Sequence, residues 1–197
     1  MAAGDTELGL GLGVYAELLP NNCGHVGDDN ATMRFRRAFS DRFDFGFDFF
    51  VGTQGGNTLG GTPKAALRYL VTPGLRLEVG IGVADGGGER NLNADVAAVL
   101  GTHNQTKTWN YYMSLRLAAA RGCLTCGTNT NHAPGALVPL GAIGTTARIS
   151  DNTKFVMEGG WGGIFARQYS SPASYIHLFC GIQFNVGKAR HPASATP

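Results

Sequence analysis

The stretch Arg42–Gly52, RFDFGFDFFVG, decides the fold class of this chain. An apolar series on every second position (Phe43, Phe45, Phe47, Phe49, Val51) alternates with a second series (Asp44, Gly46, Asp48, Phe50, Gly52). Period-two alternation indicates a β-strand, because successive side chains leave a strand on opposite faces. The stretch is therefore predicted to be a strand with one aromatic face and one face of carboxylates and glycines.

Composition limits the class of protein before any motif does. The 197 residues suffice for one domain, and the 30 glycines are about twice the usual share. The 16 basic and 14 acidic residues nearly cancel, so no nucleic-acid partner is expected. Only four residues are lysines (Lys64, Lys107, Lys154 and Lys188), and all are predicted at or near strand ends. This scarcity is unusual for a soluble protein, which spreads lysine over its surface.

No run of about 18 apolar residues is present, which excludes a transmembrane helix. The N-terminal sequence MAAGDTELGL has no basic segment followed by an apolar core, so it does not resemble a signal peptide.

The same alternation recurs along the chain and predicts ten strands. They cover residues 7–18, 31–39, 42–52, 65–71, 75–84, 94–101, 108–120, 137–149, 154–165 and 174–187. Long polar or glycine-rich loops (17–30, 53–64, 85–93, 121–136 and 166–173) alternate with tight turns. An even number of antiparallel strands with short turns at one end and long loops at the other is typical of an outer-membrane barrel. Eight strands remain an alternative, because the hairpin around THNQTK (102–107) has the weakest signal.

The two faces of the strands have opposite character, which indicates that lipid lies outside. One face is uncharged and rich in leucine and phenylalanine. The other carries Glu7, Arg34, Arg36, Asp44, Asp48, Arg68, Arg76, Glu78, Asp95, Arg116, Arg148 and Glu158 among glycines. A soluble barrel would place those glycines on its wet surface, where they weaken strands. We therefore predict a closed, all-β, antiparallel up-and-down transmembrane β-barrel.

The second face is predicted to form a charge network inside the narrow barrel. Its members are Arg34, Arg36, Arg68, Arg76, Arg116 and Arg148, paired with Asp44, Asp48, Glu78 and Glu158. Each buried charge needs a partner to offset its desolvation. On the outer wall, Trp109 and Trp161 are candidate interfacial anchors at opposite rims.

Three modules, SDRFDFGFDFFVG, TPGLRLEVGIGVA and SDNTKFVMEGGWG, resemble the turn-then-strand units of small bacterial outer-membrane β-barrel proteins, the superfamily that includes the OmpA-like transmembrane domain. The resemblance covers residues 6–187. It implies a single barrel domain (1–187), an outer-membrane location and export with a signal that has been removed. Residues 188–197 depart from it, because small members often end on an aromatic residue; we expect these residues to form a flexible tail.

Cysteines and histidines offer two further interpretations. Cys123 and Cys126 form a C-x-x-C in the longest loop, and Cys23 lies in the first long loop. In an oxidising exterior a disulfide is favoured, within the C-x-x-C or from it to Cys23; a metal site with His25 or His132 is the alternative. Cys180 is expected to face lipid. No cofactor is predicted.

The polar face also holds Ser114, His177 and Glu158, the residue types of a serine hydrolase. No local nucleophile signature surrounds Ser114, and polar residues inside a small barrel usually satisfy one another, so we expect no enzyme. The favoured function is a structural, anchoring or partner-binding component of the envelope, with a largely plugged lumen. Its partners would be outer-membrane lipid and an envelope protein contacted through long loops or the outer wall. The alternatives are a narrow porin-like channel and, third, a hydrolase.

Overall fold

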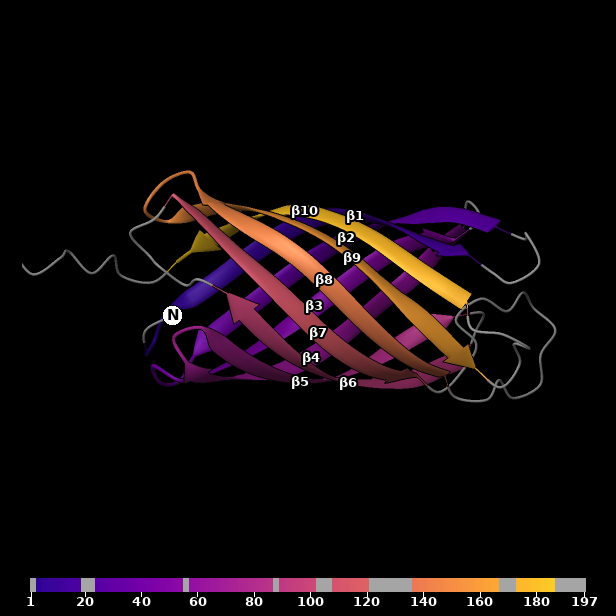
Figure 1. Cartoon of the computed structure of the whole chain (residues 1–197), viewed down its shortest axis with the longest axis horizontal. Coiled ribbons are helices and arrows are strands. Elements are labelled where there is room, and N and C mark those ends of the chain that lie inside the picture. The colour runs from indigo at the N-terminus through magenta and orange to yellow at the C-terminus, as the bar shows by residue number, and fades with distance from the viewer. Residues whose placement is uncertain are drawn as a thin grey trace, which may run out of the picture.

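Ten antiparallel strands close into a barrel in the computed structural model (Figure 1). The structure describes residues 3–18, 24–54, 57–86, 89–101, 108–120, 136–166 and 173–186. The strands are β1 (Thr6–Leu18), β2 (Gly24–Ala38), β3 (Phe43–Gln54), β4 (Asn57–Thr72), β5 (Leu75–Gly86), β6 (Glu89–Gly101), β7 (Trp109–Ala120), β8 (Ala136–Arg148), β9 (Thr153–Ala166) and β10 (Ala173–Asn185). Within these ranges no helix is long and apolar enough to cross a membrane.

Each strand pairs with its neighbours in sequence, and β1 pairs with β10 to close the wall. The strands lean across the long axis in Figure 1, as barrel closure requires. In the pairing of β1 with β10, Leu12 lies opposite Cys180 and Gly11 lies opposite Gly181. The prediction of ten strands in an up-and-down barrel is confirmed, and the hairpin around 102–107 forms as β6 and β7.

Three strands begin earlier than the sequence pattern predicts. β2 begins at Gly24, β4 at Asn57 and β6 at Glu89, each inside a segment that we expected to be loop. Two of these extensions include a register shift, between Tyr15 and Glu17 in β1 and between Phe50 and Gly52 in β3. A bulge of this kind interrupts the alternation of side chains while the backbone stays paired, so a period-two pattern does not reveal the extension.

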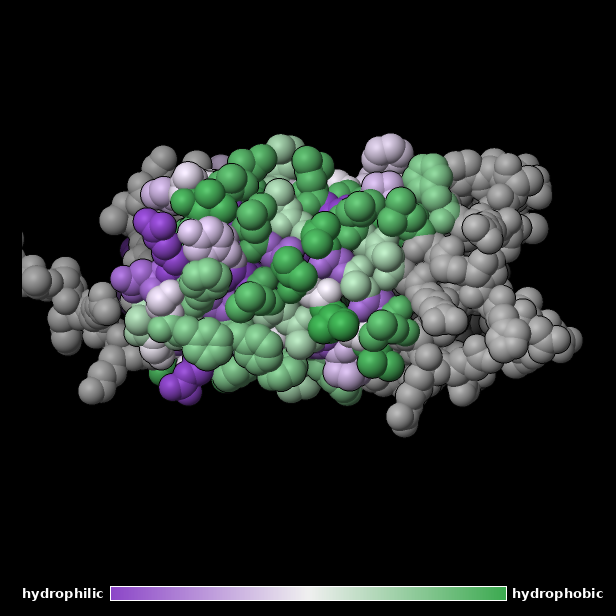
Figure 2. All heavy atoms as spheres, turned by 90° about the horizontal axis from the view of Figure 1, so that it is seen from below, coloured by the Kyte–Doolittle hydropathy of each residue, from purple (hydrophilic) through white to green (hydrophobic). Residues whose placement is uncertain are grey.

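The outer face of the wall is apolar. Large hydrophobic side chains are exposed on it along every strand, among them Leu10, Met33, Phe47, Leu67, Val79, Val96, Leu115, Ile143, Met157 and Leu178. Figure 2 shows one side of the barrel covered mainly by hydrophobic residues. Trp109 lies at the first residue of β7, beside the short turns, and Trp161 lies in the half of β9 nearer the long loops. Both are exposed.

Aromatic rings on the outer face of β3 contact one another, a ring on β4, and a ring in the turn between β2 and β3. The ring centroids of Phe45 and Phe47 are 4.7 Å apart with their planes nearly perpendicular, and those of Phe43 and Tyr69 are 4.6 Å apart. Phe39 lies 6.3 Å from Phe45. The stretch that decided the fold thus presents Phe43, Phe45, Phe47 and Phe49 outward. Its two aspartates lie on the lumen side, together with Phe50.

Candidate functional site in the barrel lumen

The deepest charged group of the lumen is Arg36 on β2. Its side chain is fully buried, and Nη2 donates to Oδ2 of Asp48 on β3 at 2.9 Å. Arg34, two residues earlier, donates from Nε to the other oxygen of Asp48 at 3.0 Å. Nε of Arg36 has no hydrogen-bond partner among the described residues. One carboxylate therefore joins two arginines that share a strand face.

A second cluster, around Lys64 of β4, joins four strands. Nζ of Lys64 lies 2.7 Å from Asp95 on β6 and 3.4 Å from Glu78 on β5. Arg116 on β7 donates to the same two carboxylates, at 3.1 Å each. The side chains of Glu78 and Asp95 are only 7% and 8% exposed. Two cations and two carboxylates thus form a compensated cluster in the lumen.

Three members of the predicted network are placed or paired differently in the structure, and Lys64 joins the charged residues of the lumen. Asp44 pairs with Arg68 at 2.6 Å. Arg148 does not lie deep in the lumen; it is the last residue of β8 and is exposed. Arg76 makes no ion pair with any described residue, and Glu158 pairs with a histidine in place of an arginine. Lys64, which we predicted to lie near a strand end, is buried within β4.

Glycines in the lumen make room for the long side chains. Gly80 pairs in register with Asp95, and a methyl group there would meet Oδ2 of Asp95 at 2.9 Å and also the end of Lys64. Gly46, opposite Arg36 in register, would meet the Arg36 side chain in the same way. The high glycine content thus has a steric cause, because each of these side chains lies flat over the glycine of a neighbouring strand.

On the opposite wall a smaller cluster centres on Glu158 of β9. Tyr112 on β7 donates its hydroxyl to Oε2 at 2.9 Å, and Nε2 of His177 on β10 lies 3.1 Å from Oε1. The hydrolase interpretation needs Ser114 beside His177. No hydrogen bond joins these two side chains in the described part of the chain, and Ala142 and Gly160 lie between them in the register. Both oxygens of Glu158 are engaged within the wall.

The two walls of the lumen differ in their access to water. On β2 to β6 the inward side chains of Thr32, Asp44, Asp48, Lys64, Ala66, Glu78, Asp95 and Ala97 are buried. On β7 to β10 the inward Asn110, Tyr112, Ser114, Leu140, Thr146, Glu158, His177, Phe179 and Gln183 are partly exposed, whereas the inward Val138, Ala142 and Val156 are buried. Arg34 and Arg116, at the inner border of the charged clusters, are 30% and 31% exposed. Buried charges thus concentrate on one side of the lumen, and the partly exposed polar side chains lie mainly along the other.

The cysteine interpretations fall mostly outside the described residues. Cys23, Cys123 and Cys126 belong to segments whose placement is not described, so neither the disulfide nor the metal alternative is tested. Cys180 is a free, exposed thiol on the outer face of β10. In the described segments no three His, Cys, Asp or Glu side chains form a group that could hold a metal ion. The expected tail, 188–197, also lies outside the described residues.

Comparison with known proteins adds to this picture at the level of the fold. No protein-family model matches the chain, and no curated protein matches it in sequence. Among solved structures, Neisserial surface protein A is 8% identical with a TM-score of 0.49, and the match covers 92% of this chain and 98% of that one. The translocator domain of the autotransporter NalP from Neisseria meningitidis is 10% identical, with a TM-score of 0.49 and coverage of 93% and 89%.

The outer membrane protease OmpT from Escherichia coli is 8% identical, with a TM-score of 0.48 and coverage of 92% and 96%. The closed barrel of ten antiparallel strands is itself the architecture that the resemblance to small bacterial outer-membrane barrels implies.

Proposed function

We propose that the chain is an integral outer-membrane barrel whose lumen is largely filled by paired charges, and that it serves as a structural, anchoring or partner-binding component of the envelope. The observation that carries the proposal is the inversion of polarity across the wall. On β5, Val79 is 58% exposed outward, whereas the neighbouring Glu78 is 6% exposed and ion-paired inside. Water outside would favour the reverse arrangement.

The outer wall supports a lipid environment over most of its height. Its exposed residues include leucines and valines on every side, with tryptophan at both ends of the wall, where amphipathic rings are stable at a lipid interface. A soluble monomer rarely exposes so continuous an apolar surface. The closed wall also leaves none of its ten strands as an open edge, as lipid requires.

The buried charges support a largely closed lumen. A side chain that lines an open aqueous pore has contact with water, yet Arg36 is fully buried and Asp48 is 3% exposed. These charged groups are neutralised by one another and not by solvent. Such a barrel holds loops and an outer wall in place without conducting solutes, which suits anchoring or partner binding.

Reconstitution tests the proposal in two steps. Barrel formation in lipid vesicles is followed by the shift of gel mobility on heating, and single-channel conductance is then recorded in a planar bilayer. We expect insertion without stable conductance steps. A double variant, Arg36→Ala with Lys64→Ala, should insert and gain steps because it empties the filled side. Failure to insert, with a soluble β-rich monomer instead, would overturn the proposal.

A narrow channel is the second candidate function. It is favoured by the partly exposed lane along β7 to β10, which runs from Asn110 and Gln183 near the short turns past Glu158 to His177 and Leu140. In the same recordings, small reproducible steps from the unaltered barrel would support the channel. Replacement of Gly160 by Leu, which narrows the lane beside His177, should then abolish those steps.

A further inference from the structure

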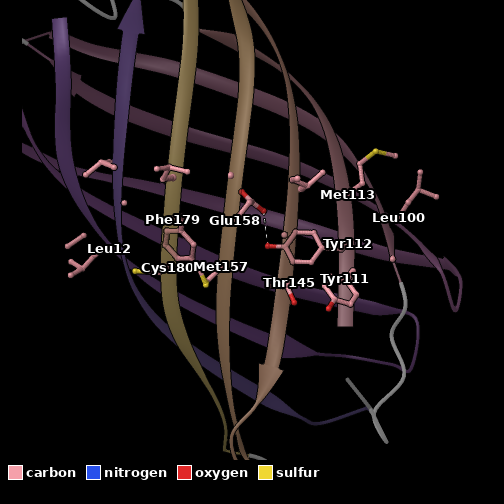
Figure 3. A pocket seen from close by; sticks show the side chains of 18 of the residues that line it. Leu12, Leu100, Tyr111, Tyr112, Met113, Thr145, Met157, Glu158, Phe179 and Cys180 are labelled. Carbon is pink, nitrogen blue, oxygen red and sulfur yellow. Dashed lines mark hydrogen bonds between the residues drawn. The ribbon is translucent and has the colours of Figure 1, made fainter. Parts of the chain in front are cut away.

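The outer wall contains a continuous apolar furrow that runs across the strands. Its volume is about 1470 Å³, and the described residues that line it come from eight of the ten strands, all except β4 and β5. One border is a row of side chains that are successive register partners: Leu12, Cys180, Met157, Thr145 and Tyr111. Figure 3 shows these five labelled residues in a line across neighbouring strands.

The second border is the next outward row, two residues further along each strand. It includes Val14, Leu178, Ile143 and Met113, which are 43–70% exposed. Between the rows lie residues whose side chains point into the lumen, such as Tyr112 and Glu158. The bottom of the furrow is therefore the backbone of the wall, at inward-facing positions that include Gly13 and Gly144.

The furrow runs obliquely to the barrel axis, because it follows the hydrogen-bonding direction between tilted strands. Its lower end reaches Leu100, next to the last residue of β6, on the side of the short turns. Its upper end reaches Val51, close to the end of β3, on the side of the long loops. Seven strand spacings of about 4.8 Å give a path of about 34 Å. With strands tilted by about 40°, this path rises about 22 Å along the barrel axis. A single leaflet of hydrocarbon is about 15 Å thick, so the furrow extends into both leaflets.

We propose that this furrow is a binding site for lipid acyl chains, at least one from each leaflet, held longer than the lipid around the rest of the barrel. The proposal rests on the membrane location proposed above. Charge supports this occupant. Among the described lining residues only Glu158 is charged, and it directs its carboxylate to Tyr112 and His177 inside the wall. The furrow therefore offers an uncharged surface to an uncharged chain.

Shape distinguishes an acyl chain from a protein. The furrow curves around most of a closed barrel, so a straight helix would touch it over a few strands only. A second copy of the barrel is itself convex and would leave most of the furrow open, with too small a contact for a stable dimer. A flexible hydrocarbon chain follows the curve and contacts both borders, and dispersion contacts accumulate along its length.

A matched pair of substitutions tests the site. Ala31 lies between Leu12 and Val51 in the register, is exposed and lines the furrow, so Ala31→Phe should obstruct it. Ala94 is also outward and exposed but lies outside the furrow, and Ala94→Phe is the control. In vesicles that contain acyl-chain spin-labelled phosphatidylcholine, we expect a loss of motionally restricted lipid for Ala31→Phe and none for Ala94→Phe. Equal amounts of motionally restricted lipid around the two variants would overturn the proposal.

A second measurement needs no bulky substitution. With Cys23, Cys123 and Cys126 replaced by serine, a fluorophore on Cys180 reports from inside the furrow, and one on Ala94→Cys with Cys180→Ser reports from outside it. Brominated acyl chains should quench the fluorophore on Cys180 at a lower ratio of brominated lipid to protein than the fluorophore on Ala94→Cys. Equal quenching, or disulfide-linked dimers through Cys180 in the vesicles, would contradict acyl-chain occupancy. Heat-shifted mobility shows in each case that the barrel has inserted, so loss of the lipid site is distinguishable from failure of the membrane proposal.

Discussion

Lys64 reaches across the backbone of Gly80 to bind Asp95, two strands away in the barrel. Its Nζ lies 2.7 Å from Oδ2 of Asp95, and a methyl group on Gly80 would collide with both side chains. This ion pair therefore depends on a glycine in the strand between its two partners. The relationship links the unusual composition of the chain to the stability of its interior.

Gly80→Ala should destabilise the barrel, because the added methyl group displaces Lys64 from Asp95. Overpacking of this kind costs about 1–3 kcal/mol in the free energy of unfolding. Gly141→Ala is the control, since its methyl group would face outward with its nearest neighbouring side-chain atom 3.8 Å away. Urea unfolding in lipid vesicles, followed by gel mobility, measures both. Equal stability of the two variants would show that the close approach over Gly80 is not required.

Arg36 and Arg37 are adjacent on β2, but Arg36 points into the lumen and Arg37 points outward. Substituting each in turn therefore separates the loss of a lumen charge from the loss of an outer one. Arg36→Met leaves the buried Asp48 with only Arg34 as its partner and should cost about 3–5 kcal/mol, as loss of one member of a buried ion pair does. Arg37→Met changes an exposed outward side chain and should alter stability by no more than about 0.5 kcal/mol. Thermal unfolding in detergent measures both variants. If Arg36→Met has the same melting temperature as the unaltered protein, the charge network is not what stabilises the lumen.

Tyr112 and Glu158 should be energetically coupled through their hydrogen bond of 2.9 Å. Tyr112→Phe removes a donor to a charged acceptor, at a cost of about 1.5–3 kcal/mol. A double-mutant cycle with Glu158→Gln should give an interaction energy of about 0.5–3 kcal/mol. The cycle is measured by urea unfolding. Strictly additive effects would mean that the contact does not hold β7 and β9 together across the lumen.

The sequence pattern predicted the barrel, the faces of its strands and most of the charged lumen residues, because alternation alone decides which side chains turn inward. Pairing partners were harder to predict, since they depend on register. The strand predicted over 65–71 begins too late, because β4 starts at Asn57. In the structure Pro63 lies within β4 and pairs with Phe49 beside a register shift. Lys64 was therefore predicted near a strand end, although Lys64, Ala66 and Arg68 share one face.

The partners of Glu158 illustrate the second limit. Its neighbour in β10 is Phe179 by register, yet its carboxylate reaches His177 diagonally and Tyr112 two strands away. Such contacts depend on side-chain direction and on the empty space over Gly144 and Gly160, which one sequence does not encode as a local pattern. The furrow on the outer wall is of the same kind, because its two borders exist only once the register of eight strands is fixed.

The central claim is that lipid surrounds this barrel, and two arginine substitutions at different heights test it most directly. Val79 lies near the middle of the outer wall and Val71 lies next to the end of β4; both are exposed. In the free energy of folding into lipid vesicles, we predict a loss of about 2–4 kcal/mol for Val79→Arg and of about 0–1 kcal/mol for Val71→Arg. If both variants fold as well as the unaltered protein, the outer wall contacts water and the two faces have been assigned in reverse.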